Sequence, residues 1–291
     1  MGTLADAGRL HLRYGEQVVA DMEMAFLHKG IPRRKLTAVW REPPQVEPPA
    51  SSPGGEELAQ ALLDILAHPN VRSKEDVVRC YDHEVQGGTL IKPFVGARSD
   101  GPSDAAVLRP LETADSWLGL AVGCGINPAY GALDPYAMAI AAIDEAVRNV
   151  VAVGADPERI AILDNFCWGN PLLPDRMGSL VRACKGCYDS ALHYGTPFIS
   201  GKDSLNNEYT DTTTGQQVSI PPSLLISALG IVPDVRLACT MDLKAPGNHL
   251  YLLGETRREL GGSYYYRLRG WTGGAVPALA AAGPATARAL H

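Results

Sequence analysis

The chain has 291 residues, of which 26 are basic and 32 are acidic, so its formal net charge is −6. With 46% apolar and 20% charged residues it has the composition of a globular protein, and about 100–200 residues per domain would allow one large domain or two ordinary ones. The mild acidity argues against nucleic-acid binding, the apolar runs are too short for a membrane span, and six cysteines are too few for a disulfide scaffold. Charged residues near the start also argue against a signal peptide, so we expect a cytoplasmic protein.

The first part of the chain divides into two segments. Residues 1–41 contain two alternating apolar runs on either side of Tyr14-Gly15-Glu16, a pattern that predicts a β-hairpin. Residues 42–55 are rich in proline and glycine and therefore predict a linker or an extended strap.

Residues 56–242 alternate between helix and strand signals and form the predicted main domain. Ser73 and Asp76 form a capping box for a helix over 73–83, and Asp134-Pro135 opens a long helix that Gly154 ends. The other signals are a helix over 56–68, strands near 104–111, 116–125, 159–168, 196–204 and 219–232, and a helix that carries Cys184 and Cys187. We expect an α+β fold, a mixed or antiparallel sheet with helices on one face.

Residues 243–291 begin with a Gly-Asn turn and the short apolar run HLYLLG, which predicts a strand. The final stretch is short and rich in alanine and proline. We therefore expect one intact domain between the tail of one neighbouring domain, residues 1–41, and the truncated start of another, residues 243–291.

Two side chains on the long predicted helix could hold a metal ion. Glu145 and Asn149 are four residues apart and lie on one face among small apolar residues. A carboxylate and an amide oxygen suit Mg²⁺, whose remaining positions phosphates can fill. The alternative is a solvated helix edge, and these two residues alone do not decide between them.

Other acidic residues lie near predicted strands. Asp104 opens one strand, Asp164 ends another, and Asp203 follows Gly201 and Lys202 in the turn Gly-Lys-Asp-Ser. Such a turn offers backbone N–H groups and a lysine to a phosphate, and a carboxylate to the metal bound to that phosphate. Taken alone, the turn fits an ordinary polar loop better.

The pair Cys184 and Cys187 forms a lone C-x-x-C, because no second pair stands at zinc-site spacing. We interpret both as buried or unreactive thiols.

Six blocks of sequence, in this order and spacing, closely resemble the phosphoribosylformylglycinamidine (FGAM) synthase family: YDHEVQGGT, DAAVL, DEAVRNVVAVGADP, AILDNFCWGNP, GTPFISGKDSLNNEY and IPPSLLISALGIV. The resemblance spans about residues 1–265 and covers part of that enzyme: the end of its first half, the N-terminal ATP-binding domain of its second half, and the start of the next domain. It implies the fold of the aminoimidazole ribonucleotide synthetase-like superfamily, in which two such domains pair and form nucleotide sites.

The resemblance also implies a reaction and a set of site residues. The family is a carbon–nitrogen ligase of purine biosynthesis, which uses ATP and glutamine or ammonia to convert formylglycinamide ribonucleotide into formylglycinamidine ribonucleotide. The implied Mg²⁺ ligands are Asp104, Glu145, Asn149 and Asp203, the nucleotide contacts are Asp164, Gly201 and Lys202, and the substrate contact is Ser204. The small-subunit members have Asn where this chain has Lys202, which moves the expected metal ligand to Asp203.

No catalytic residue is expected within this chain, because the histidine motifs of the family's first half are absent from it. The implied partners are that first half and a glutaminase domain or subunit, and self-association is expected through the uncovered pairing surface. The alternatives are a non-catalytic domain that holds nucleotide for structural or regulatory purposes, and another ATP-dependent member of the superfamily.

Overall fold

The computed structural model describes residues 2–46, 48, 53–84, 86–113, 115–278 and 283–290, in two compact units, 1–37 and 38–291. In the first unit, β1 (Arg9–Tyr14) pairs antiparallel with β2 (Gln17–Glu23), and α1 (Met24–Lys29) follows. Gly15 turns the chain between the strands with φ at +59°, which glycine adopts without a steric cost. The predicted hairpin is confirmed.

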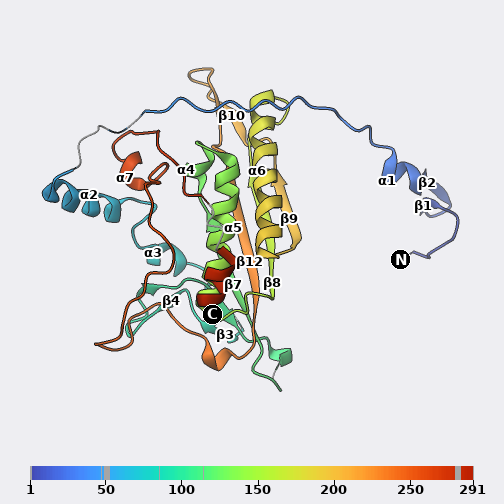
Figure 1. Cartoon of the computed structure of the whole chain (residues 1–291). Coiled ribbons are helices and arrows are strands. Elements are labelled where there is room, and N and C mark those ends of the chain that lie inside the picture. Colours follow the sequence, from blue (N-terminus) through green and yellow to red (C-terminus); the bar gives the residue numbers. More distant parts are fainter. Residues whose placement is uncertain are drawn as a thin grey trace. The chain divides into compact units, whose positions relative to one another are not determined.

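The second unit is built on a six-stranded mixed sheet (Figure 1). The strand order is β3 (Thr89–Ile91), β6 (Ala106–Leu108), β7 (Gly119–Ile126), β12 (Ser223–Val232), β8 (Ile160–Cys167) and β9 (Phe198–Ser204). Neighbouring strands are antiparallel except β8 and β9, which are parallel and are joined through α6 (Pro174–Tyr194). Because β7, β8 and β9 therefore run in one direction, their carboxyl ends lie at the same edge of the sheet.

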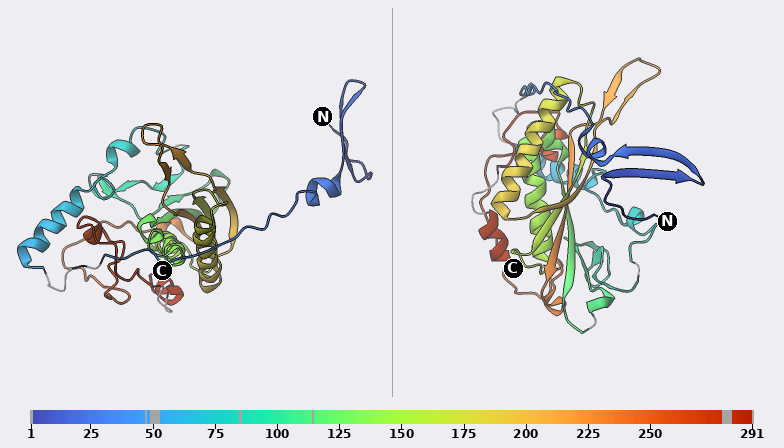
Figure 2. Two further views of the ribbon diagram at one scale, coloured as in Figure 1. Left: turned by 90° about the horizontal axis from the view of Figure 1, so that it is seen from above. Right: turned by 90° about the vertical axis from the view of Figure 1, so that its right-hand side faces the viewer.

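The helices cover one face of this sheet (Figure 2). The long helix α5 (Pro135–Ala152) packs on β7 and β12, α6 packs beside α5, and α8 (Gly283–Leu290) packs on both helices. Alternate residues of β12, Leu224, Ile226 and Ala228, are fully buried beneath them, as the two-residue period of a strand requires. The prediction of an α+β fold with helices on one face is confirmed.

Local signals explain where α5 starts and stops. The Asp134 carboxylate caps the helix by accepting a hydrogen bond from the Tyr136 N–H at 2.9 Å, and it also accepts two from the Arg182 guanidinium, at 2.7 and 2.9 Å. Gly154 follows the helix with φ at +111°. Because Arg182 belongs to α6, the cap also fixes the two helices to each other.

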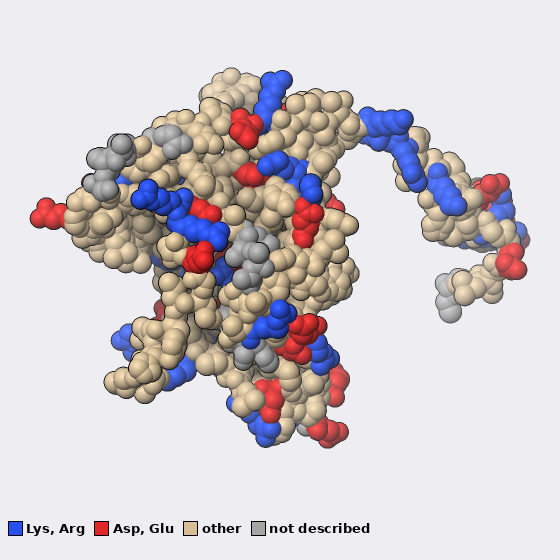
Figure 3. All heavy atoms as spheres, viewed as in Figure 1, with Lys and Arg blue, Asp and Glu red and all other residues tan. Residues whose placement is uncertain are grey.

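The shorter elements surround this layer. They are α2 (Gly55–Ala67), α3 (Glu75–Val78), β4 (Phe94–Val95), β5 (Gly101–Pro102), the 3₁₀ helices Leu111–Thr113 and Val235–Leu237, α4 (Pro128–Gly131), β10 (Glu208–Thr210), β11 (Gln217–Ser219) and α7 (Tyr264–Arg267). Figure 3 shows basic and acidic side chains interspersed on one face of this unit, as expected from 26 basic and 32 acidic residues. Within the described ranges, no helix combines the length and the apolar character needed to cross a membrane.

Two predicted elements differ from the structure. The helix expected over 73–83 is shorter in the structure, where only the four residues of α3 are helical. Ser73 Oγ does accept a hydrogen bond from the Glu75 N–H at 3.2 Å, as a cap would. The positive φ of Asp82, +31°, is incompatible with a helix that continues to residue 83. The run HLYLLG is not a strand, because among the described residues none pairs with it, and Leu250 and Leu252 are more than 80% exposed. The domain boundaries after residues 41, 55 and 242 stay predictions.

Candidate functional site

Helix α5 lies directly on β7 because the strand presents glycine to it. A Cβ atom added at Gly125 would lie 2.0 Å from the Ala142 carbonyl oxygen, so a larger residue does not fit there. At Gly123 the added atom would meet side chains at 3.0–3.4 Å. This close approach brings polar side chains of α5 within hydrogen-bonding reach of the end of β7.

Glu145 and Asn149 make those hydrogen bonds. Glu145 Oε2 accepts from the Ile126 N–H at 3.0 Å and from Asn127 Nδ2 at 2.9 Å, while Asn149 Nδ2 donates to the Cys124 carbonyl at 2.8 Å. Among the described contacts, Glu145 Oε1 and Asn149 Oδ1 have no hydrogen-bond donor. The amide is thus oriented with its oxygen available, as a metal ligand requires.

Asp104 approaches the same strand from the other side. It is exposed and lies two residues before Ala106, which pairs with Val122 of β7. Continued by two residues, that antiparallel register leads Asp104 toward Cys124, the residue whose carbonyl holds Asn149. Ala105 is the residue on the α5 side, since its Cβ would lie 3.4 Å from an atom added at Gly123. The structure thus brings Glu145 and Asn149 together at the end of β7, and no contact among the described residues joins Asp104 to them.

The remaining predicted residues lie on β8 and β9. Asp164 and Gly201 are register partners, and a Cβ atom added at Gly201 would lie 2.3 Å from Asp164 Oδ1, so glycine leaves the space that this carboxylate fills. Asp203 is two residues further on, on the same face. Burial, and then the negative charge of Asp203, raise the pKa of Asp164.

Lys202 and Ser204 point to the opposite face of β9, because side chains alternate along a strand. The Lys202 ammonium donates a hydrogen bond to Ser204 Oγ. The predicted nucleotide contacts are therefore divided: Asp164 and Gly201 face the helices, and Lys202 lies beside Ser204 on the open face.

The two groups lie at one level of the sheet but are separated by two strands. The pairing register aligns Ile126, Leu225, Asn165 and Lys202 in one row from β7 to β9. Three interstrand spacings amount to about 14 Å, whereas a Mg²⁺–oxygen bond is about 2.1 Å, so Asp203 and Glu145 cannot bind the same ion. No three His, Cys, Asp or Glu side chains in the described ranges are placed to hold a metal together.

The donor set at the end of β7 nevertheless fits Mg²⁺. Glu145 and Asn149 offer one carboxylate and one amide oxygen there, and Mg²⁺ commonly takes one or two protein carboxylates while phosphates and water complete its octahedron. Glu145 also lines a cavity of about 420 Å³ together with Tyr130, Arg148 and Glu259. Burial, then the charges of Glu145 and Glu259, raise the pKa of Tyr130, consistent with a negatively charged pocket.

The cysteines of the C-x-x-C motif are free thiols in the structure. Cys187 is buried, and burial, followed by the neighbouring Cys184 and Asp164, raises its pKa to about 12. Cys184 is exposed as a whole residue, but its thiol is partly covered, and this burial, followed by the charges of Asp203 and Asp164, raises its pKa. Thiols with raised pKa values are poor metal ligands and poor nucleophiles, because both roles need the thiolate.

Sequence reasoning missed the groups that hold Glu145, namely Asn127 and the backbone of Ile126. A signal for this contact was present in β7, where Gly119, Ala121, Gly123 and Gly125 occupy alternate positions. Small residues on one face of a strand allow a helix to approach closely, and the four-residue spacing on α5 could then have been matched to that face.

Comparison with known proteins agrees with this architecture. Residues 102–232 match the family described as AIR synthase related protein, N-terminal domain. The phosphoribosylformylglycinamidine synthase subunit PurL of Methanothrix thermoacetophila is 36% identical over 288 residues, which cover 95% of this chain and 35% of that protein. The chain is a homologue of one segment of PurL. The PurL subunit of Methanocaldococcus jannaschii is 40% identical over 215 residues, 73% of this chain and 27% of that protein.

Solved PurL structures share the fold. The structure of PurLQS from Thermotoga maritima has a TM-score of 0.55 at 21% identity and covers 80% of this chain and 33% of that chain. The T. maritima PurL complexed with ADP gives a TM-score of 0.54 at 21% identity, over 79% of this chain and 33% of that one. The present chain thus spans about a third of the length of the PurL proteins that it matches.

Proposed function

We propose that this chain is a portion of FGAM synthase that contributes Mg²⁺ and nucleotide ligands to the ATP-dependent conversion of formylglycinamide ribonucleotide, with glutamine or ammonia, into formylglycinamidine ribonucleotide. The observation that carries the proposal is the geometry at the end of β7. Glu145 and Asn149 are each held by hydrogen bonds to the strand, and each keeps one oxygen without a donor. This arrangement lies within the domain that matches the AIR synthase family.

The residues take separate roles in this proposal. Asp104, Glu145 and Asn149 bind one Mg²⁺, which when bound offsets the negative charge of the nucleotide phosphates. Asp203, beside Asp164 and Gly201, serves a second position at the same sheet edge. On the open face of β9, Lys202 contacts phosphate and Ser204 contacts substrate, in reach of a domain that covers this face.

In this proposal the protein acts in the cytoplasm. Its partners are the other synthetase half and the glutaminase domain or subunit, which lie outside these 291 residues. The uncovered sheet face supports this, because the half-exposed Leu120 and Val122 of β7 and Leu225 and Leu229 of β12 point away from the helices. Such a face favours association with a second domain or, in its absence, with a second copy of this chain. In the same proposal, residues 1–41 end a preceding domain, 42–55 link it to the ATP-binding domain over 56–242, and 243–291 begin the next domain.

Calorimetric titration with ADP, with and without Mg²⁺, tests the ligand assignment. We expect Glu145→Gln and Asp203→Asn each to weaken Mg-ADP binding at least tenfold, which corresponds to about 1.4 kcal/mol. Glu158→Gln is the matched control, since Glu158 is exposed and pairs only with Arg288 among the described residues. Equal affinity with and without Mg²⁺, or unchanged binding by the double variant, would show that these residues bind no metal-nucleotide complex.

A second experiment tests the activity. The chain alone should form no amidine product from ATP, substrate and ammonium salts, because the groups that orient the substrate lie in the missing half, and loss of such positioning can remove factors of about 10⁵ in effective molarity. A separately expressed first half should restore ammonia-dependent ADP release. Turnover by this chain alone would refute the half-site proposal. Nucleotide that stays bound without turnover in the reconstituted complex would instead identify a nucleotide-holding domain.

A further inference from the structure

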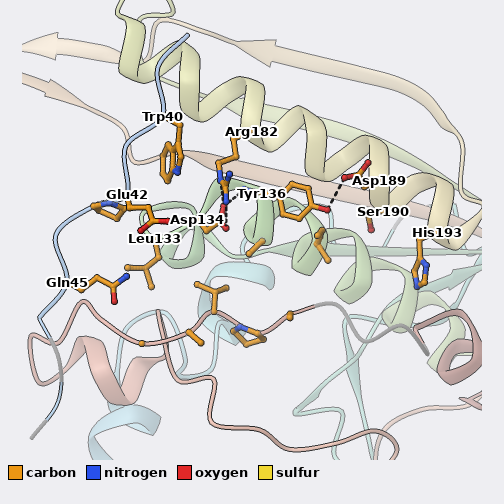
Figure 4. A pocket seen from close by; sticks show the side chains of 18 residues that line it. Trp40, Glu42, Gln45, Leu133, Asp134, Tyr136, Arg182, Asp189, Ser190 and His193 are labelled. Carbon is orange, nitrogen blue, oxygen red and sulfur yellow. Dashed lines mark hydrogen bonds and ion pairs between the residues drawn. The ribbon is translucent and has the colours of Figure 1, made fainter.

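A second cavity lies beside the one that Glu145 lines, and the two share Ile140, Pro277 and Ala278. It measures about 740 Å³ and is enclosed by α5, α6, residues 38–46, which we call the strap, and residues 274–278 (Figure 4). We call it the strap cavity. None of the predicted metal, nucleotide or substrate residues lines it. Its volume is typical of sites that bind small organic molecules.

The walls of the strap cavity are fixed by backbone hydrogen bonds. The Val39 N–H donates to the Pro174 carbonyl at 2.8 Å, which fixes one end of the strap to the start of α6. At the other end, the Val46 carbonyl accepts from Thr272 and Gly273, at 3.2 and 3.0 Å, and the Val46 N–H donates to Thr272 Oγ1 at 3.1 Å. Gly178 lets the strap lie directly on α6, because an added Cβ atom would be 2.2 Å from the Val39 carbonyl oxygen. The cavity is therefore preformed.

One buried hydroxyl in the cavity wall has no partner. Ser190 of α6 is 1% exposed and lines the cavity, yet its Oγ makes no hydrogen bond within the described structure. Figure 4 shows Ser190 on the side of α6 that faces the cavity. Buried polar atoms are normally hydrogen-bonded, so an orphan hydroxyl at a cavity wall indicates a ligand atom that would complete the pair.

The charges of the wall indicate which ligands fit. Three carboxylates, those of Glu42, Asp134 and Asp189, line the cavity, against one guanidinium, that of Arg182. That guanidinium is already bound to Asp134 through two hydrogen bonds, at 2.7 and 2.9 Å, and Asp189 accepts from Tyr136 Oη at 2.9 Å. Asp189 is also paired with the Lys185 ammonium, at 2.8 Å, so Glu42 is the lining carboxylate without an ion pair among the described residues. The wall therefore keeps one uncompensated negative charge, which favours cations and hydrogen-bond donors over phosphates.

The remaining wall is aromatic and apolar. Arg182 packs over Trp40 and Tyr136, with its central carbon 5.5 and 5.9 Å from the two ring centres, and Leu133 and Val276 also line the cavity. Such surfaces accept flat rings, because stacking buries both faces of the ring.

We propose that the strap cavity binds an uncharged or cationic planar nitrogen compound, a heterocycle or aryl amidine, whose ring lies against the Trp40 and Tyr136 side and whose nitrogen groups hydrogen-bond with Ser190 Oγ and the Glu42 carboxylate. None of the proposed Mg-nucleotide ligands lines this cavity, although it adjoins the cavity that Glu145 lines, and the proposal does not depend on the function proposed above. The unpaired Glu42 carboxylate disfavours the phosphorylated compounds that the other site is proposed to take.

Three small probes test the proposal on the 291-residue chain: benzamidine, which is cationic, adenine, which is neutral, and benzoate, which has the same ring as benzamidine and the opposite charge. We expect saturation-transfer NMR and calorimetry to show binding of benzamidine and adenine, and at least tenfold weaker binding of benzoate. Ser190→Ala should weaken adenine binding three- to tenfold, the range expected for one hydrogen bond, without lowering the melting temperature of the free protein.

Thr196→Val is the matched control. Thr196 is 2% exposed and its hydroxyl also lacks a partner within the described structure, but it does not line the cavity. We expect this variant to bind the probes as the wild type does, and Mg-ADP binding to be unchanged in both variants. The proposal is overturned if neither benzamidine nor adenine binds, if benzoate binds as tightly as benzamidine, or if Ser190→Ala and Thr196→Val affect binding equally.

Discussion

Substitution of Gly125 by alanine tests whether the contact between α5 and β7 determines the position of the candidate metal ligands. The added Cβ atom would lie 2.0 Å from the Ala142 carbonyl oxygen and 2.9 Å from the Ala146 nitrogen. Both are backbone atoms, so no side-chain rotation relieves the overlap. Because ordinary contacts at such positions begin at 3.4 Å, the helix must retreat by about 1.4 Å, the difference between 3.4 and 2.0 Å.

The expected cost combines strain with lost hydrogen bonds. Overpacking of a core costs about 1–3 kcal/mol, and a retreat of α5 also stretches the bonds from Glu145 to Ile126 and from Asn149 to Cys124, each worth about 1 kcal/mol. We therefore expect Gly125→Ala to lower the free energy of unfolding by about 3 kcal/mol or more. That is a large share of the 5–15 kcal/mol by which typical domains are stable.

Urea unfolding followed by tryptophan fluorescence measures this change. All four tryptophans, Trp40, Trp117, Trp168 and Trp271, lie in residues 38–291, so the signal reports on the second unit alone. The control is Gly123→Ala, whose added atom meets only side chains at 3.0–3.4 Å, and we expect it to cost less than about 1 kcal/mol. A Gly125→Ala protein as stable as the wild type, or less affected than Gly123→Ala, would refute the reasoning.

Three further predictions concern single side chains. Because the pKa of Asp164 is raised, the folded protein holds the proton of this carboxyl more tightly than the unfolded chain does, and the free energy of unfolding should fall as pH rises from about 3.9 through the raised pKa. Asp203→Asn should lessen that fall, and urea midpoints measured against pH would show the difference. Asp134→Ala should cost more than about 1 kcal/mol in thermal or urea unfolding, because it removes both the α5 cap and the partner of Arg182, whereas Asp134→Asn should retain most of the cap. Cys187, buried and with a pKa of about 12, should resist a thiol reagent at pH 8 until the protein is unfolded, whereas exposed Cys239 should react at once; native labelling of Cys187 at the rate of Cys239 would contradict its burial.

Much of the fold could be predicted because it depends on local signals. The Asp134-Pro135 start of α5, its Gly154 stop and the Tyr14-Gly15 turn of the hairpin all involve residues close in sequence. The run HLYLLG was wrongly predicted as a strand because strand formation also depends on residues far away in the sequence. Its apolar pattern is local, but a strand forms only when another strand supplies hydrogen bonds, and no described segment does so here.

The site could be predicted less completely. The four-residue spacing of Glu145 and Asn149 indicated a shared helix face, and the structure shows both side chains reaching the end of β7. The strand order was not readable from the sequence, since β12 comes last in the chain yet lies between β7 and β8. That order separates Asp203 from Glu145, and pairwise spacing along a chain contains no information about it.

The strap also has a consequence for how this protein folds. Val46 and Thr272 are 226 residues apart in sequence, far more than the neighbours that meet in the hairpin or within the helices. Closing so long a loop costs conformational entropy that local contacts do not require, and contacts of large sequence separation slow folding. The six-stranded sheet and its helices can therefore assemble before the strap is in place. We therefore expect the residues that close the cavity to join the structure late, and removal of either residues 38–46 or residues 274–278 to leave the cavity open on that side.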